Sequence, residues 1–300
     1  MASSVAVGRR EAAFTLPRVW TIVLPWLGVL PFFLFTVLFL ILPSSSLFIE
    51  SFQNSKGEFT LENIAALFSD PRIVPGYAAS IQISAFTALV GGIFGFLLAY
   101  AVTLGGLPRW IRSSYVTFSG VASNFAGVPL AFAFIAVLGR VGNITAFLKS
   151  IGIDLYAMGF TLYDFWGVSL VYLFFQFPLM LLIMIPSLEG LKREWREAAE
   201  NLGATGFEYW RRVAFPILLP SLLGTMILLF GNAFGAYATA FALTGGRLNL
   251  LTIQIGAQIR GDVLHNPNLG YAMALGMVFI MLVCIIGYTL LQRLTERWLR

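Results

Sequence analysis

The sequence predicts an all-α integral membrane protein with six transmembrane helices. Of its 300 residues, 58% are hydrophobic and 11% are charged, and the mean hydropathy is +0.84. A water-soluble domain of this length has no core large enough to bury so much apolar surface. A membrane-spanning helix needs about 20 apolar residues. Runs of that length cover residues 20–42, 76–104, 114–138, 165–186, 213–243 and 271–291.

The first two apolar runs are flanked by a basic tail, a polar loop and a tight turn. Residues 1–19 form a short basic tail, and the first run is too long for a signal-peptide core, so we expect a span that stays in the membrane. In the polar loop 43–75, the stretch FTLENIAALFSDP predicts a short helix from about Leu61. The glycines of the second run suit close helix packing or are ordinary membrane glycines. A tight turn, 105–113, follows that run.

The remaining runs are separated by polar loops of different length. The third run is unusually polar, and the loop 139–164 follows it. Gly245 and Gly246 end the fifth run, and LNLLTIQIGAQIR in the loop 246–270 is expected to lie along the membrane surface. With these boundaries every Lys, Arg, Asp and Glu lies outside the six spans.

The distribution of Lys and Arg predicts the orientation. Of the 19 basic residues, 13 lie in the two tails, the turn 105–113 and the loop after the fourth run. Cytoplasmic loops carry the excess of Lys and Arg, so these segments, and both termini with them, are expected to be cytoplasmic. The net charge of +5 is likewise attributed to Lys and Arg at the cytoplasmic face of the membrane, so it gives no reason to expect nucleic acid as a partner.

The loop after the fourth run is the most charged part of the chain. Between Glu189 and Arg212 it has ten charged residues in 24 positions, so it lies outside the lipid. Leu191, Trp195, Ala198 and Leu202 are spaced as one apolar stripe of a short amphipathic helix. Gly203 is placed to end that helix in a left-handed conformation. The sequence TGFE at 205–208 predicts a capping box that starts a second helix.

The spacing in this loop resembles the EAA loop of membrane subunits of ATP-binding-cassette (ABC) importers. Glu197-Ala198-Ala199, three residues, Gly203, nine residues and then VAFP ending at Pro216 match the pattern EAA-x3-G-x9-I-x-L-P, with Val for Ile and Phe for Leu. The alternative is an ordinary solvated, charged loop between two membrane helices. The resemblance implies instead a coupling helix that inserts into a groove of a separate ATPase.

The same resemblance implies the type I importer permease fold, with residues 20–300 as one transmembrane permease domain, a core at 76–291 and the coupling loop at 189–216. Its implied partners are an ABC ATPase dimer, a second and different permease subunit, and a periplasmic or lipid-anchored substrate-binding protein, in a bacterial inner membrane. The residues implied in ATPase coupling are Leu191, Trp195, Glu197, Ala198, Ala199, Leu202, Gly203 and Pro216.

The chain offers no candidate for catalysis or metal binding. No paired carboxylates or Ser-His-Asp set occur within the spans, and one histidine, His265, and one cysteine, Cys284, cannot build a metal site or an intramolecular disulfide. No phosphate-binding G-x-x-x-x-G-K-[ST] loop occurs. We therefore expect a non-catalytic subunit without a cofactor, whose partner ATPase binds ATP and Mg²⁺.

Polar residues within the spans are the candidates for lining a translocation path. Each is also a candidate for helix–helix hydrogen bonding, which is the commoner role. The fifth run is favoured, because Asn232, Ala236 and Thr239 share one face at helical spacing, flanked by glycines. The full candidate set is Ser123, Asn124, Gln176, Asn232, Ala236 and Thr239.

Over about residues 60–295 the chain resembles importer permeases for polyamines, with relatives for thiamine, iron, sulfate and phosphonates. FTLENIAALFSDP, LGRVGNITAFLKSIGI and the glycines of the fifth run carry the resemblance. It implies a spermidine/putrescine-type permease, half of a pore for a small solute that an external binding protein delivers. The alternative is a stand-alone secondary transporter or channel, but ionisable residues within the spans, which usually mark proton relays, are absent from the predicted runs.

Overall fold

The computed structural model describes residues 18–261 and 265–299 and is almost entirely helical. The chain separates into two compact units, residues 1–49 and residues 50–300, and each is described by itself. Hydropathy and length identify six candidate membrane spans among the described residues, at Gly28–Ser51, Ile73–Leu104, Gly127–Ser150, Phe165–Glu189, Gly206–Phe234 and Pro267–Leu290.

From Arg18 onward, where the structure describes it, the first unit is one uninterrupted helical path. Helix α1 (Arg18–Thr36), a π-helical turn η1 (Val37–Ile41) and helix α2 (Leu42–Ser51) follow one another directly. Apart from half-buried Leu47, the large apolar side chains described in the candidate span are exposed, as a helix facing lipid requires. The hydroxyls of Ser44 and Ser45 donate to the carbonyls of Leu40 and Leu42, at 2.6 and 2.7 Å, which satisfies these polar groups without water.

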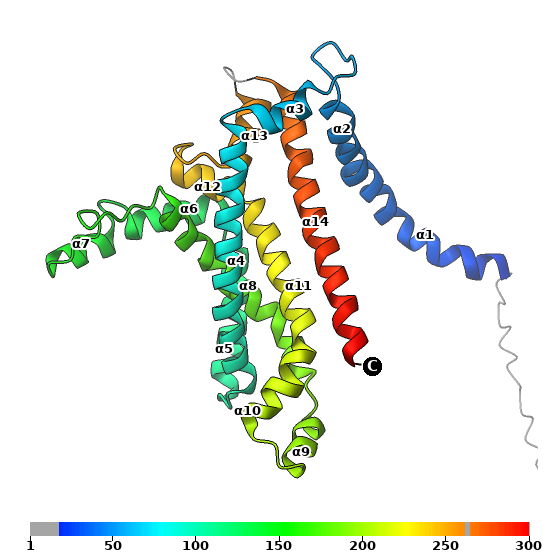
Figure 1. The fold of residues 1–300 in the computed structure, drawn as a ribbon, viewed down its shortest axis with the longest axis vertical. Coiled ribbons are helices and arrows are strands. Elements are labelled where there is room, and N and C mark those ends of the chain that lie inside the picture. The colour runs from blue at the N-terminus through cyan, green and yellow to red at the C-terminus, as the bar shows by residue number, and fades with distance from the viewer. Residues whose placement is uncertain (1–17, 262–264, 300) are drawn as a thin grey trace, which may run out of the picture. The chain divides into compact units, whose positions relative to one another are not determined.

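The second unit is a bundle with short helices at both ends (Figure 1). Helices α9 and α10 lie at one end, called here the α9 end, and helices α3 and α13 lie at the opposite, α13 end. The helices of this unit are α3 (Glu62–Ser69), α4 (Ile73–Leu104), α5 (Arg109–Asn124), α6 (Gly127–Leu138), α7 (Asn143–Ser150), α8 (Phe165–Glu189), α9 (Arg193–Asn201), α10 (Gly206–Tyr209), a π-helical turn η2 (Trp210–Ala214), α11 (Phe215–Phe234), α12 (Tyr237–Thr244), α13 (Leu251–Arg260) and α14 (Pro267–Leu299).

Glycines bring the central helices of the bundle close together. Helix α4 packs most extensively on α8 and α11. A Cβ added at Gly95 would lie 2.6 Å from the Cβ of Met180, and one added at Gly92 would lie 2.8 Å from the Cγ of Met226. The predicted role of these glycines in close packing is therefore confirmed.

Two of the predicted spans are broken in the structure. The third run was expected to be continuous, but α5 ends at Asn124 and α6 begins at Gly127, which has φ of +74°. The fifth run is likewise interrupted at Gly235 and Ala236 between α11 and α12. Sequence periodicity does not show these breaks, because the residues on both sides of each break remain helical.

Side chains from neighbouring helices bond to the backbone groups that the breaks free. The backbone N–H of Gly127 donates to Oγ1 of Thr239 at 2.7 Å. The hydroxyl of Tyr172 on α8 donates to the carbonyl of Ala236 at 2.8 Å. Irregular backbone at membrane depth is tolerated where protein groups satisfy it in this way. The first bond also joins the two breaks, which lie next to each other because α6 packs on α12.

Candidate functional site

The loop between α8 and α11 reverses direction through two helix signals. Gly203 has φ of +81°, and its N–H donates to the carbonyl of Glu200 at 2.9 Å as α9 ends. The N–H of Thr205 donates to Oε2 of Glu208 at 2.9 Å, and the N–H of Glu208 donates to Oγ1 of Thr205 at 3.3 Å. This capping box starts α10. Both predicted signals are confirmed.

The charges of α9 pair with one another along the helix. Nε of Arg193 lies 2.8 Å from Oε1 of Glu197, and Nε of Arg196 lies 2.8 Å from Oε1 of Glu200. Exposed pairs of this kind, four residues apart, give a short helix a small, solvent-screened stabilisation. They stabilise the helix, and the apolar side chains between them remain available for contact.

The tip of the loop exposes apolar side chains. Leu202 is 88% exposed and Phe207 is 74% exposed, while Trp195 lies under the Nζ of Lys192, 5.8 Å from its ring centroid. Ala198 is exposed and Ala199 is half-buried. These exposed apolar side chains lie on a loop that is otherwise charged.

The predicted stripe is not one continuous helical face, which corrects one expectation. Helix α9 begins at Arg193, so Leu191 precedes it, and Leu191 packs half-buried against the core formed by α4, α8 and α11. Pro216 is half-buried in the first turn of α11. Leu191 and Pro216 therefore fasten the loop to the bundle, whereas Glu197, Ala198, Leu202 and Gly203 are exposed.

Two contacts that sequence reasoning missed hold the loop against the bundle. The ring of Trp210 meets Tyr100 of α4 edge-on, with ring centroids 5.0 Å apart. The guanidinium of Arg112 on α5 pairs with the carboxylate of Glu189 at the end of α8. A tryptophan among charges indicates an aromatic or apolar partner, but no spacing in the sequence identifies Tyr100 as that partner.

The structure separates the six candidate path residues. Gln176 is fully buried, and its Nε2 donates to the carbonyl of Leu229 at 3.0 Å. Thr239 is also buried and accepts the N–H of Gly127. These two residues join helices to one another, the alternative recognised from the sequence.

The other four candidates lie nearer the surface of the unit. Asn232 and Asn124 are exposed, and Ser123 and Ala236 are half-buried. Nδ2 of Asn124 donates to the carbonyl of Gly120 in its own helix at 2.9 Å. The break at 235–236 removes the single helical face on which Asn232, Ala236 and Thr239 were expected, so that argument is wrong. The residues are instead gathered around the two breaks.

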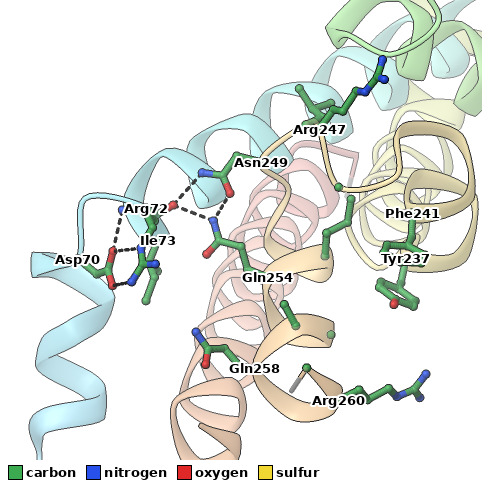
Figure 2. A pocket seen from close by; sticks show the side chains of 16 residues that line it. Asp70, Arg72, Ile73, Tyr237, Phe241, Arg247, Asn249, Gln254, Gln258 and Arg260 are labelled. Carbon is green, nitrogen blue, oxygen red and sulfur yellow. Dashed lines mark hydrogen bonds and ion pairs between the residues drawn. The ribbon is translucent and has the colours of Figure 1, made fainter. Parts of the chain in front are cut away.

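A cavity of about 580 Å³ lies at the α13 end, between the start of α4, α12 and α13 (Figure 2). The carbonyl of Arg72 accepts from Nδ2 of Asn249 at 2.9 Å and from Nε2 of Gln254 at 2.7 Å. The guanidinium of Arg72 pairs with Asp70 at 3.4 Å, and the Arg72 backbone N–H holds the pKa of the Asp70 carboxyl below its usual range. Arg247 and Arg260 add two further guanidinium groups to the lining.

A second cavity, of about 840 Å³, shares Arg247 with the first. It lies where α6 and α12 end, beside residues 156–163, and we call it the tyrosine pocket after Tyr156 and Tyr163 in its wall. The sequence did not predict either cavity, because their walls come from loops far apart in the chain.

Comparison with known proteins identifies the family. Residues 91–300 match the model of the family described as binding-protein-dependent transport system inner membrane component. The probable sulfate transport system permease protein of Nephroselmis olivacea is 30% identical, over 69% of this chain and 68% of that protein. The sulfate transport system permease protein of Escherichia coli (strain K12) is 28% identical, over 71% of this chain and 72% of that protein. A ferric transport system permease protein of Actinobacillus pleuropneumoniae is 24% identical over 83% of this chain, which spans 36% of that longer protein.

Solved structures share the fold. A bacterial ABC transporter that imports the acidic polysaccharide alginate superposes with a TM-score of 0.69 at 15% identity, over 94% of this chain and 99% of that one. The MetNI methionine ABC transporter superposes with a TM-score of 0.54 at 17% identity, over 76% of this chain and 99% of that one. At these identities the likeness concerns the fold alone.

The relatives correct one expectation and support the broader one. The predicted likeness to spermidine/putrescine-type permeases is not supported, since the relatives found are sulfate and ferric permeases. The six spans and the family place the chain in the inner membrane as a multi-pass, non-catalytic subunit, with ATP hydrolysed by a partner. The chain therefore belongs to the binding-protein-dependent inner membrane components of ABC importers.

Proposed function

We propose that this chain forms half of the translocation pore of an ABC importer and that its 189–216 loop docks into the partner ATPase. The observation that carries the proposal is the exposed apolar tip of a loop whose backbone is fixed by Gly203 and by the Thr205–Glu208 capping box. A free-standing secondary transporter or channel has no use for such a loop.

The proposal includes an orientation and a set of partners. The α9 end and both termini face the cytoplasm, in agreement with the excess of Lys and Arg in those segments. The α13 end faces outward, where a periplasmic or lipid-anchored binding protein delivers cargo. A second permease subunit completes the pore, an ATPase dimer supplies ATP and Mg²⁺, and this chain itself holds no cofactor.

For the cargo we propose an inorganic oxyanion of the sulfate class, with ferric ion as the second candidate. The sulfate permeases of Nephroselmis olivacea and Escherichia coli align over about two thirds of both chains, whereas the ferric permease aligns over 36% of its own length. The cationic linings of both cavities at the α13 end favour an anion.

The first prediction tests the coupling loop with Gly203→Leu and Ala198→Trp. Leucine at position 203 is strained at φ of +81° although the space around it is open, so the loop changes shape. An indole ring at the exposed position 198 holds the ATPase away from the loop. Each variant is expected to insert at the wild-type level and to lose ATP-driven uptake, measured in cells together with membrane abundance.

Gly206→Ala is the matched control. Gly206 lies in the same loop with open space around it and without a left-handed backbone, so alanine there is expected to leave uptake unchanged. Normal uptake by Gly203→Leu or Ala198→Trp at wild-type abundance would contradict the assignment of this loop to ATPase docking.

A further inference from the structure

All the charged side chains that line the tyrosine pocket are positive. Among its lining residues, which all lie within the described chain, the charged ones are Arg140 and Arg247. Hydroxyl groups of Thr161, Tyr156 and Tyr163 share the wall with them. A basin with two guanidinium groups and no carboxylate among its lining residues attracts anions.

The two arginines are held in place by aromatic rings. The guanidinium carbon of Arg140 lies 5.7 Å from the ring centroid of Tyr156, and that of Arg247 lies 5.6 Å from the ring centroid of Tyr163. The hydroxyl of Tyr156 donates to the carbonyl of Leu138 at 3.0 Å, which fixes the first ring. Stacking occupies the face of a guanidinium and leaves the N–H groups at its edge free to bind oxygen atoms.

Acidic groups near the pocket already have partners. Asp154 pairs with Nζ of Lys149 at 3.2 Å. Asp164, beside Tyr163, accepts the N–H of Gly167 at 2.9 Å and so caps α8. Neither Arg140 nor Arg247 forms an ion pair with any acid in the part of the chain that the structure describes. The two guanidinium groups are therefore available to a ligand.

The position of the pocket relates it to the broken helices. Helices α6 and α12 both begin at the joined breaks, and both end at this pocket, beside Arg140 and Arg247 respectively. At 1.5 Å per residue, α6 is about 18 Å long. A solute in the pocket thus lies one short helix away from the breaks, at the end of the bundle proposed to face outward.

We propose that the tyrosine pocket binds a tetrahedral oxyanion of the sulfate class through the N–H edges of Arg140 and Arg247 and the hydroxyl of Thr161. Oγ1 of Thr161 accepts the N–H of Tyr163 at 3.2 Å, so its own proton remains free to be donated. Paired guanidinium groups match the oxygen geometry of such an anion. The inference rests on the proposed function for the direction of transport and the class of cargo.

The test measures sulfate occupancy directly in the purified complex of the permease with its ATPase. Cys284→Ala removes the chain's one cysteine, and Ala242→Cys places a reporter thiol in the wall of the pocket. The reaction of this thiol with a negatively charged thiosulfonate reagent is followed while sulfate is added, with chloride at matched ionic strength. Sulfate is expected to slow the reaction and chloride is not.

Removal of either arginine should weaken this protection. Arg140→Gln and Arg247→Gln are each expected to raise the half-protecting sulfate concentration about 10-fold or more, because each removes charge-assisted hydrogen bonds. Tyr163→Leu, which removes the ring beside Arg247, should also raise it, while Tyr163→Phe should not. The matched control is Lys56→Gln, which removes the same charge from the same side of the membrane but outside the pocket lining.

Three results of the labelling experiment would overturn the inference, and one result of an uptake experiment would do so as well. The labelling results are protection by sulfate no greater than by chloride, protection unchanged when both arginines are replaced, and an equal loss of protection in Lys56→Gln. The labelling needs no ATP, so it is independent of coupling. If ATP-driven uptake with the binding protein carries Fe³⁺ and not sulfate, the importer function stands and the oxyanion site is wrong. If no solute is taken up by the assembled wild type, the proposed function fails.

Discussion

The role of a glycine in a membrane helix of this protein depends on the atoms that pack against it. Gly95 and Gly287 are both membrane-helix glycines, yet an added Cβ at Gly95 meets the Cβ of Met180 at 2.6 Å and the carbonyl of Phe177 at 3.0 Å, while Gly287 has nothing within 4 Å. Composition treats the two positions alike. The contacts show that one glycine sets the α4–α8 distance and the other does not.

A valine at position 95 is therefore expected to destabilise the bundle. Gly95→Val forces α4 away from α8, and overpacking of this kind costs about 1–3 kcal/mol in the free energy of unfolding. Gly287→Val, at an open position in α14, should leave that free energy nearly unchanged. Denaturant unfolding of the two purified variants in the same detergent distinguishes them, and equal stability would show that Gly95 does not control the packing.

The elements that set the architecture of the second unit are the two broken helices. The backbone N–H of Gly127 and the carbonyl of Ala236 both find side-chain partners, and one of these bonds ties one break to the other. Asn232 and Thr239 lie on opposite sides of the second break, so they lack the shared helical face that the sequence predicts. The breaks also start the two short helices that end at the tyrosine pocket.

The hydroxyl group of Thr239 should therefore contribute more to the stability of the protein than the methyl group of the same side chain. Thr239→Val leaves the N–H of Gly127 without its acceptor, and an unsatisfied buried group costs about 1–3 kcal/mol. Thr239→Ser keeps the acceptor and is expected to stay within about 1 kcal/mol of wild type, since it removes one methyl group. Thermal unfolding of both variants measures the difference. An unchanged midpoint for the valine variant would mean that this bond does not join the breaks.

Across the whole molecule, the sequence predicted the features that adjacent residues determine. It did not predict the contacts between residues far apart in the chain. The helix at Glu62–Ser69, the left-handed Gly203, the capping box and the glycine stop after Thr244 were each foreseen, because a few adjacent residues determine them. The bond between the two breaks and the pairing of Trp210 with Tyr100 each join residues more than 100 positions apart. The motif spacing identified the transport machinery, but the predicted polyamine type was not supported by the relatives found.

The central claim, that the 189–216 loop is the cytoplasmic docking site of an ATPase, is tested most directly by a thiol at its exposed tip. Leu202 is 88% exposed, so Leu202→Cys in a Cys284→Ala background offers one accessible thiol, with Lys56→Cys as the matched site proposed to face outward. An impermeant thiol reagent added to intact cells should label position 56 and not position 202. In inside-out vesicles position 202 should react, and bound ATPase should protect it. Labelling of position 202 from outside the cell, or equal reactivity with and without the ATPase, would contradict the claim.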